Sequence, residues 1–210
     1  MALRLVVATG NPGKAAELAD VLLAAEGLGD LELLARPAGL PEPEEDGATL
    51  ADNARIKARA VAAATGEAAV ADDTALEVAA LGGAPGLHTA RYAGAGASPD
   101  DNMAKLLAEL EGVADRRARW RTVALVAFPG GAEVVAEGSC EGTITGSRRG
   151  SGGFGYDPVF VPAGGDGRTL AELAPAEKNA LSHRGRAFRA LAGRLATFCA
   201  GGMDERAPLP

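Results

Sequence analysis

Cysteine is scarce in this sequence. The chain has 2 cysteines in 210 residues, Cys140 and Cys199, and they lie far apart in unlike surroundings. Disulfide-rich domains and cysteine-based metal sites instead place several cysteines at short spacings. The sequence therefore excludes a disulfide framework, and we expect two reduced thiols.

Long apolar runs and excess positive charge are also absent. No stretch approaches the ~18 consecutive apolar residues of a membrane span, and the opening MALRLVVATG lacks the features of a secretory signal. Lys and Arg number 21 against 28 Asp and Glu, a net charge of −7. Since no large basic surface is available, nucleic acid is an improbable partner. We expect a cytoplasmic protein without membrane contacts.

The remaining composition is that of a folded protein. Hydrophobic residues make up 47% of the chain and charged residues 23%, and the length is within that of one domain. No internal repeat or long linker interrupts it. The sequence therefore predicts a single domain over residues 1–200. Residues 201–210 carry Gly, Pro and charges without periodicity, which predicts a frayed C-terminal tail.

Helical and strand patterns alternate along the chain. Helices are predicted over 14–27, 49–66 and 99–112, as a short helix from Thr169, and as a terminal helix from near Ser182. Thr49 is the expected N-cap and Gly66 the expected end of the second helix, and Ser98 is the expected cap of the third, with Pro99 at its first position. Strands are predicted over 3–8, 31–35, 68–73, 75–78, 120–128, 132–144 and 156–161, with an acidic corner between the third and fourth. This order is typical of an α/β fold. The sheet must be mixed, because the hairpin over 120–144 is antiparallel.

The first candidate site is the segment Thr9-Gly10-Asn11-Pro12-Gly13-Lys14, between a predicted strand and a helix. A helix N-terminus offers unpaired N–H groups, and a lysine beside it adds a full charge, so the segment suits an oligophosphate. It is not a P-loop, because its spacing differs and Ala15 replaces the metal-binding hydroxyl. An ordinary turn with a solvated lysine is the alternative interpretation.

Carboxylates cluster in two places. Asp72 and Asp73 end a strand-like run, where hard oxygen ligands could hold Mg²⁺. Alternation along a strand sends the two side chains to opposite faces, so at most one points into a given site. Glu44, Glu45 and Asp46 form a second acidic cluster, which is solvated surface unless folding brings it near Asp73.

A glycine-rich segment, 150–155, matches G-x-G-x-x-G in form. It precedes a predicted strand, whereas the dinucleotide fingerprint follows a strand and opens a helix, so we reject that function. The segment could instead pack against a flat ligand, with Phe154 as an aromatic face and Asp157 as a hydrogen-bond acceptor. The alternative is a turn with Phe154 in the core.

One of only 2 histidines, His183, lies in the segment 177–184 at a predicted helix start. The donors that flank it could recognise the polar edge of a base. A lone histidine is more often structural, so both interpretations stay open here.

Taken in order, these segments resemble the inosine triphosphate pyrophosphatase family, the nonstandard-purine or dITP/XTP pyrophosphatases. The resemblance covers most of the chain and rests on five motifs: TGNPGK at 9–14, DGATLADNARIKA at 46–58, ADDTALEVAALGGAPGLHTARYAG at 71–94, GGFGYDPVF at 152–160 and EKNALSHRGRA at 177–187. Two of these motifs depart from the family pattern. Thr74-Ala75 replaces Ser-Gly, and Leu50-Ala51-Asp52-Asn53-Ala54 replaces Phe-x-Glu-Asn-Ala.

The resemblance implies Mg²⁺-dependent hydrolysis of a nucleoside triphosphate between its α and β phosphates. It implies an elongated α/β fold of two lobes with a long mixed sheet flanked by helices and a substrate cleft between the lobes, usually as a homodimer. Glu45 and Asp73 would bind the metal, and Asp73 would accept the proton. The implied phosphate-binding residues are Thr9, Gly10, Asn11, Pro12, Gly13, Lys14, Lys57 and Thr74. The implied base-binding residues are Phe154, Gly155, Tyr156, Asp157, Lys178, Ser182, His183 and Arg184.

Two alternatives stay open at this stage. A related pyrophosphatase of the Maf type would act on modified pyrimidines and would not need the Ser182-His183-Arg184 element. A nucleotide-binding module without activity would have no use for a water-activating acid. The presence of Glu45 and Asp73 therefore argues against this alternative.

Overall fold

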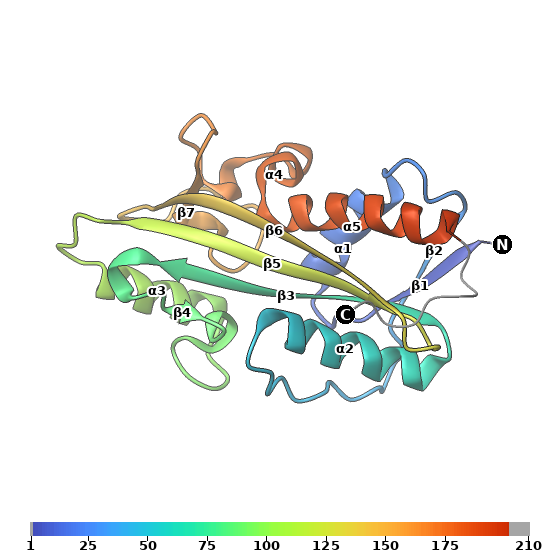
Figure 1. Cartoon of the computed structure of the whole chain (residues 1–210). Coiled ribbons are helices and arrows are strands. Elements are labelled where there is room, and N and C mark those ends of the chain that lie inside the picture. The colour runs from blue at the N-terminus through green and yellow to red at the C-terminus, as the bar shows by residue number, and fades with distance from the viewer. Residues whose placement is uncertain (1, 202–210) are drawn as a thin grey trace. The chain divides into compact units, whose positions relative to one another are not determined.

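The computed structural model describes residues 2–201 (Figure 1). The strands are β1 Leu3–Val7, β2 Leu31–Leu34, β3 Ala68–Val78, β4 Pro85–Gly86, β5 Arg117–Ala127, β6 Glu133–Ile144 and β7 Phe160–Pro162. The helices are α1 Pro12–Leu23, α2 Leu50–Thr65, α3 Pro99–Glu109, α4 Pro175–Leu181 and α5 His183–Ala200. Four short 3-10 turns, η1 Ala79–Leu81, η2 Thr89–Arg91, η3 Asp157–Val159 and η4 Leu170–Glu172, complete the order.

The strands form one mixed sheet in the order β2-β1-β3-β5-β6-β7, with β4 paired to β3. Strand β1 runs parallel to β2 and β3, while β4 runs antiparallel to β3 and β7 antiparallel to β6. The predicted α/β class with a mixed sheet is confirmed.

The chain divides into two compact units, and neither is a continuous stretch of sequence. Among the described residues, unit 1 comprises 2–73, 122–138 and 187–201, and unit 2 comprises 74–121 and 139–186. Strands β3, β5 and β6 and helix α5 each contribute residues to both units. The prediction of a single domain over 1–200 stays a prediction. Of the predicted tail, 201–210, only Gly201 is among the described residues, and it lies in a turn.

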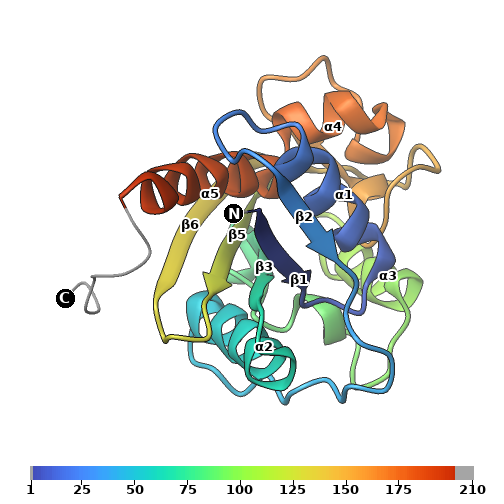
Figure 2. The ribbon, with the colours of Figure 1, turned by 90° about the vertical axis from the view of Figure 1, so that its right-hand side faces the viewer.

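In unit 1, helices cover both faces of the sheet. Helices α1 and α5 lie on one side of the strands and α2 on the other (Figure 2). The apolar side chains of α1 and α5 pack with Leu5, Val70 and Val126 in one buried cluster. Burial of such aliphatic side chains contributes roughly 1.5–3 kcal/mol each, so this cluster fixes the helices against the strands that carry the site.

In unit 2, helix α3 packs on a separate apolar cluster. Met103, Leu106 and Leu110 of α3 join side chains from β3, β5, β6 and the 156–170 segment, including Trp120 and Phe160. Ser98 caps α3 by accepting a hydrogen bond from the Asp101 N–H at 3.1 Å, and Pro99 takes the first helical position, as predicted.

Three sequence predictions need correction. Strand β3 is continuous over Ala68–Val78, without the expected corner at its aspartates. Residues 157–159 form a 3-10 turn around Pro158, which has no N–H to donate to a strand ladder, and β7 begins only at Phe160. The terminal segment contains a separate helix, α4, before α5 begins at His183.

The prediction of two reduced thiols is confirmed. Both cysteines are free thiols. No helix among the described residues has the length and apolar character needed to cross a membrane.

Candidate active site

The loop before α1 is organised by Asn11. Its side-chain Oδ1 accepts hydrogen bonds from the Gly13 N–H at 2.9 Å and the Lys14 N–H at 3.2 Å. The Asn11 N–H in turn donates to Thr9 Oγ1 at 3.1 Å, and Pro12 begins the helix. Asn11 is therefore the N-cap of α1, and its side chain binds the N–H groups that a phosphate could otherwise use.

Lys14 points toward the sheet. Its Nζ lies 3.3 Å from Asp72 Oδ2, and the Asp72 side chain is only 1% exposed. Because Asp72 pairs with a residue of α1 and Asp73 with a residue of α2, the two neighbours point to opposite faces of β3, as the alternation of a strand predicts.

Lys57, on α2, brings together two segments that are far apart in the sequence. Its Nζ lies 3.1 Å from Asp73 Oδ1 and 3.3 Å from Glu45 Oε1. The acidic loop at 44–46 therefore lies near Asp73. This is the condition under which its carboxylates could contribute to a site with Asp73. Burial lowers the pKa of Lys57, but the charges of Asp73, Asp72 and Glu45 outweigh it, so the net pKa is raised and Lys57 is a cation.

Asn53 connects the same acidic loop to Asp73. Its Nδ2 donates to Asp73 Oδ2 at 3.1 Å, and its Oδ1 accepts from the Gly47 N–H at 2.9 Å. A Cβ at Gly47 would lie 2.6 Å from Asn53 Oδ1 and 2.9 Å from the Asn53 backbone N, so only glycine fits there. Sequence reasoning gave Asn53 no role. Asn53 lies in the motif at 46–58 that also contains Gly47 and Lys57, and this position could have indicated its role in the site.

Glu45 and Asp73 fit a hard cation by their chemistry. Magnesium prefers carboxylate oxygens and is commonly held by one or two of them, with waters and substrate phosphates completing the octahedron. Within residues 2–201, no group of three or more His, Cys, Asp or Glu side chains is placed to hold a metal ion.

Unit 2 holds the predicted base-binding residues, and a buried ion pair lies at their centre. Lys178 Nζ contacts Asp157 Oδ2, and both side chains are 6% exposed. The Phe154 N–H also donates to Asp157 Oδ2 at 2.8 Å. Gly153 has a φ of +69°, and a Cβ there would lie 2.1 Å from Asp157 Oδ2, so the glycine lets this loop close on the carboxylate.

Two cationic side chains lie over the Phe154 ring. Lys178 Nζ lies 4.7 Å and Arg184 Cζ 5.2 Å from the ring centroid. The Arg184 guanidinium also donates to Thr74 Oγ1 at 3.4 Å, and Thr74 directly follows Asp73 in β3. Phe154 is half-buried and outside the apolar cluster of unit 2, so the alternative of a core phenylalanine is wrong.

Other predicted base-binding residues have structural contacts. The Ser182 hydroxyl accepts from the Gly185 N–H at 3.1 Å in the first turn of α5. The Tyr156 hydroxyl donates to the Thr89 carbonyl at 3.0 Å, and burial raises its pKa. Gly155 has a φ of +63° that favours glycine. His183 stacks on Trp120.

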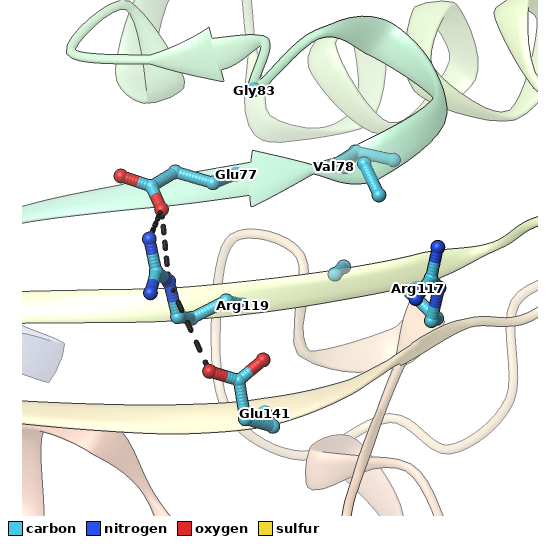
Figure 3. Close-up of a pocket in the computed structure, with 8 residues that line it drawn as sticks. Glu77, Val78, Gly83, Arg117, Arg119 and Glu141 are labelled. Carbon is cyan, nitrogen blue, oxygen red and sulfur yellow. Dashed lines mark hydrogen bonds and ion pairs between the residues drawn. The ribbon is translucent and has the colours of Figure 1, made fainter.

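A shallow pocket of about 350 Å³ lies elsewhere in unit 2 (Figure 3). Arg119 crosses it, paired with Glu77 at 2.5 Å and with Glu141 at 3.9 Å. None of the predicted site residues lines this pocket. Its charges are already balanced by ion pairs between neighbouring strands, which is typical of a solvated sheet face.

The chain is similar to known proteins over almost its full length. The model of the Ham1 family matches residues 5–194. A dITP/XTP pyrophosphatase of Methylococcus capsulatus is 51% identical over 94% of this chain and 98% of its own length. A dITP/XTP pyrophosphatase of Mycobacterium tuberculosis is 50% identical over 94% of this chain and 98% of its own.

The fold agrees with a solved structure as well. A HAM1 protein from Coxiella burnetii superposes with a TM-score of 0.79 at 38% identity, covering 95% of this chain and all of that one. Since the family model spans nearly the whole chain and the matched relatives align over almost their full length, this chain belongs to the Ham1 family.

Proposed function

We propose that the protein hydrolyses nonstandard purine nucleoside triphosphates, ITP, dITP and XTP, to the monophosphate and pyrophosphate, with Mg²⁺. The observation that carries the proposal is the convergence of Glu45 and Asp73 on Lys57 in a member of the Ham1 family. Relatives that are named dITP/XTP pyrophosphatases support the substrate class.

The two lysines of unit 1 suit a polyphosphate. Lys14 and Lys57 are held by the carboxylates of Asp72, Asp73 and Glu45. A triphosphate could replace some of these carboxylates as the partner of the lysines, because its oxygens accept charge-assisted hydrogen bonds as carboxylates do. The ammonium groups would then neutralise the charge that develops on the departing pyrophosphate.

Asp73 is the candidate for the proton acceptor. A water molecule would attack the α-phosphorus, forming the new P–O bond while the bond to the bridging α,β oxygen breaks and pyrophosphate leaves. Asp73 would take the proton of that water, and its orientation is fixed by Lys57 on Oδ1 and Asn53 on Oδ2. Mg²⁺ on Glu45 and Asp73 would supply Lewis-acid stabilisation of phosphate charge.

Unit 2 supplies the groups that suit a 6-oxopurine. Phe154 offers a face for stacking, and Arg184 beside it offers only donors. Hypoxanthine and xanthine present an acceptor at position 6, whereas adenine presents a donor. A buried donor left without an acceptor costs roughly 1–3 kcal/mol, so one such mismatch would discriminate about tenfold to a hundredfold.

A pyrophosphate-release assay with Mg²⁺ across ITP, dITP, XTP, ATP, GTP, CTP and UTP tests the proposal. We expect kcat/KM for ITP, dITP and XTP to exceed that for ATP by at least about tenfold. Preference for a pyrimidine triphosphate would instead indicate a Maf-type activity. Binding of ITP without pyrophosphate release would indicate a nucleotide-binding module.

Assembly and location complete the proposal. We expect a homodimer, which light scattering of the purified protein would test by its mass. An enzyme that removes nonstandard nucleotides acts where nucleotides are used for synthesis, so we expect a cytoplasmic location.

A further inference from the structure

Trp120 is the only tryptophan of the chain, and it lies against the first residue of α5. Its ring is stacked on that of His183, with centroids 4.8 Å apart and an interplanar angle of 14°. Both side chains are buried, at 6% and 3% exposure. Tyr156 meets Trp120 edge-on at 5.9 Å, and Phe160 lies at 6.2 Å. Three rings therefore confine the indole, and only His183 lies nearly parallel to it.

Packing alone does not explain a tryptophan here. The buried Trp120 Nε1 has no hydrogen-bond partner among the described residues. An unmet indole N–H costs free energy that a phenylalanine in the same cluster would avoid. What the indole adds over a phenyl ring is a larger flat face, and that face is the one that His183 covers.

We propose that Trp120 is a positioning residue that holds the His183 imidazole in the orientation in which it contacts the base. This inference rests on the proposed function and on the base-binding role that the family resemblance implies for His183. The next residue, Arg184, lies beside the Phe154 ring, so a fixed His183 also fixes the start of the helix turn that carries Arg184. Trp120 would act through His183 and would not touch the nucleotide.

Kinetics of Trp120→Leu, Trp120→Phe and Phe160→Leu with ITP test the role. Losing the stack in Trp120→Leu should raise KM about tenfold with kcat within about twofold, and Trp120→Phe should raise KM by an intermediate factor, because a smaller ring face remains against His183. Phe160→Leu is the matched control from the same cluster, since it should lower the thermal midpoint and leave KM unchanged. An unchanged KM in a folded Trp120→Leu variant would overturn the inference.

A double-mutant cycle with His183→Gln separates a positioning role from a general packing role. If Trp120 acts through His183, Trp120→Leu adds little to the KM of His183→Gln, whereas independent effects would multiply. Multiplying effects would overturn the inference. The emission of the single tryptophan gives a readout without nucleotide. We expect His183→Gln to change it, and an unchanged spectrum would show that the stack does not form in solution.

The two proposals fail differently. If the wild-type protein releases no pyrophosphate from ITP, the proposed function is wrong, and a base-positioning role for Trp120 falls with it. If the wild-type protein is active and the Trp120 variants keep the wild-type KM, only the role of Trp120 is wrong.

Discussion

Asn53 is an uncharged residue whose side chain links Asp73 to the acidic loop that carries Glu45. It donates to Asp73 and accepts from the backbone of Gly47, two residues after Glu45. It is 4% exposed, so both contacts lie in a medium where a missing hydrogen bond is costly. The position of the acidic loop is therefore set by an amide and a glycine as much as by the attraction between charges.

Gly47→Ala should impair the site through this contact. The new Cβ would lie 2.6 Å from Asn53 Oδ1 and 2.7 Å from Asp52 Cβ, so the loop must shift away from α2. We expect the free energy of unfolding to fall by about 1–3 kcal/mol and kcat/KM for ITP to fall with it. Gly146→Ala is the matched control, since nothing lies within 4 Å of its Cβ. Wild-type kinetics in Gly47→Ala would contradict the role of this contact.

Asp73→Asn should separate catalysis from binding. The substitution removes the proton acceptor and leaves the size of the side chain unchanged, so we expect kcat to fall by about 10²–10⁴ while ITP still binds. Pyrophosphate release and calorimetric titration with ITP measure the two quantities. Asp115→Asn, at an exposed acid of unit 2, should keep the wild-type kcat. Weaker binding with an unchanged kcat would remove Asp73 from the chemical step.

At the scale of elements, the helix caps were the most predictable features. Thr49 and Ser98 cap α2 and α3, and Gly66 ends α2 with a φ of 70°, all as the sequence indicates. Such caps are local, because each depends on a few neighbouring residues. The contacts among Glu45, Lys57 and Asp73 are not local, and single-sequence patterns could not establish them without the family resemblance.

Thr49→Ala should test whether the cap of α2 matters for the site. Thr49 Oγ1 accepts from the Asp52 N–H at 3.1 Å, and the helix it caps carries Asn53 and Lys57. We expect a loss of about 1 kcal/mol in the free energy of unfolding together with a higher KM for ITP. Ser98→Ala removes the equivalent cap of α3, and there thermal melting should show a similar loss while KM stays at the wild-type value. Equal KM effects in both variants would point to general destabilisation.

The strand predicted over 156–161 failed because its apolar residues pack in a turn and do not alternate. Tyr156, Val159 and Phe160 are buried in the cluster of unit 2, and η3 occupies Asp157–Val159. Burial in an irregular segment imitates the pattern of a strand, and Pro158 was the residue that argued against it. The same turn lets Asp157 meet Lys178 and the backbone of Phe154.

At the scale of the whole molecule, the metal should matter for turnover and not for folding. The buried clusters of the two units are built from apolar side chains, and Asp72 and Asp73 are paired with lysines. We therefore expect a chelator to abolish pyrophosphate release, excess Mg²⁺ to restore it, and the thermal midpoint in calorimetry to stay unchanged. Turnover in the presence of the chelator would contradict the metal requirement.

The interleaved course of the chain limits how this protein can be divided or rebuilt. Each of the two units is assembled from segments that leave and re-enter it, with β3, β5, β6 and α5 shared. No single cut of the polypeptide releases either unit intact, and every truncation removes material from at least one of them. We therefore expect changes of specificity to be made by substitutions within the undivided chain, and not by exchanging one unit for another.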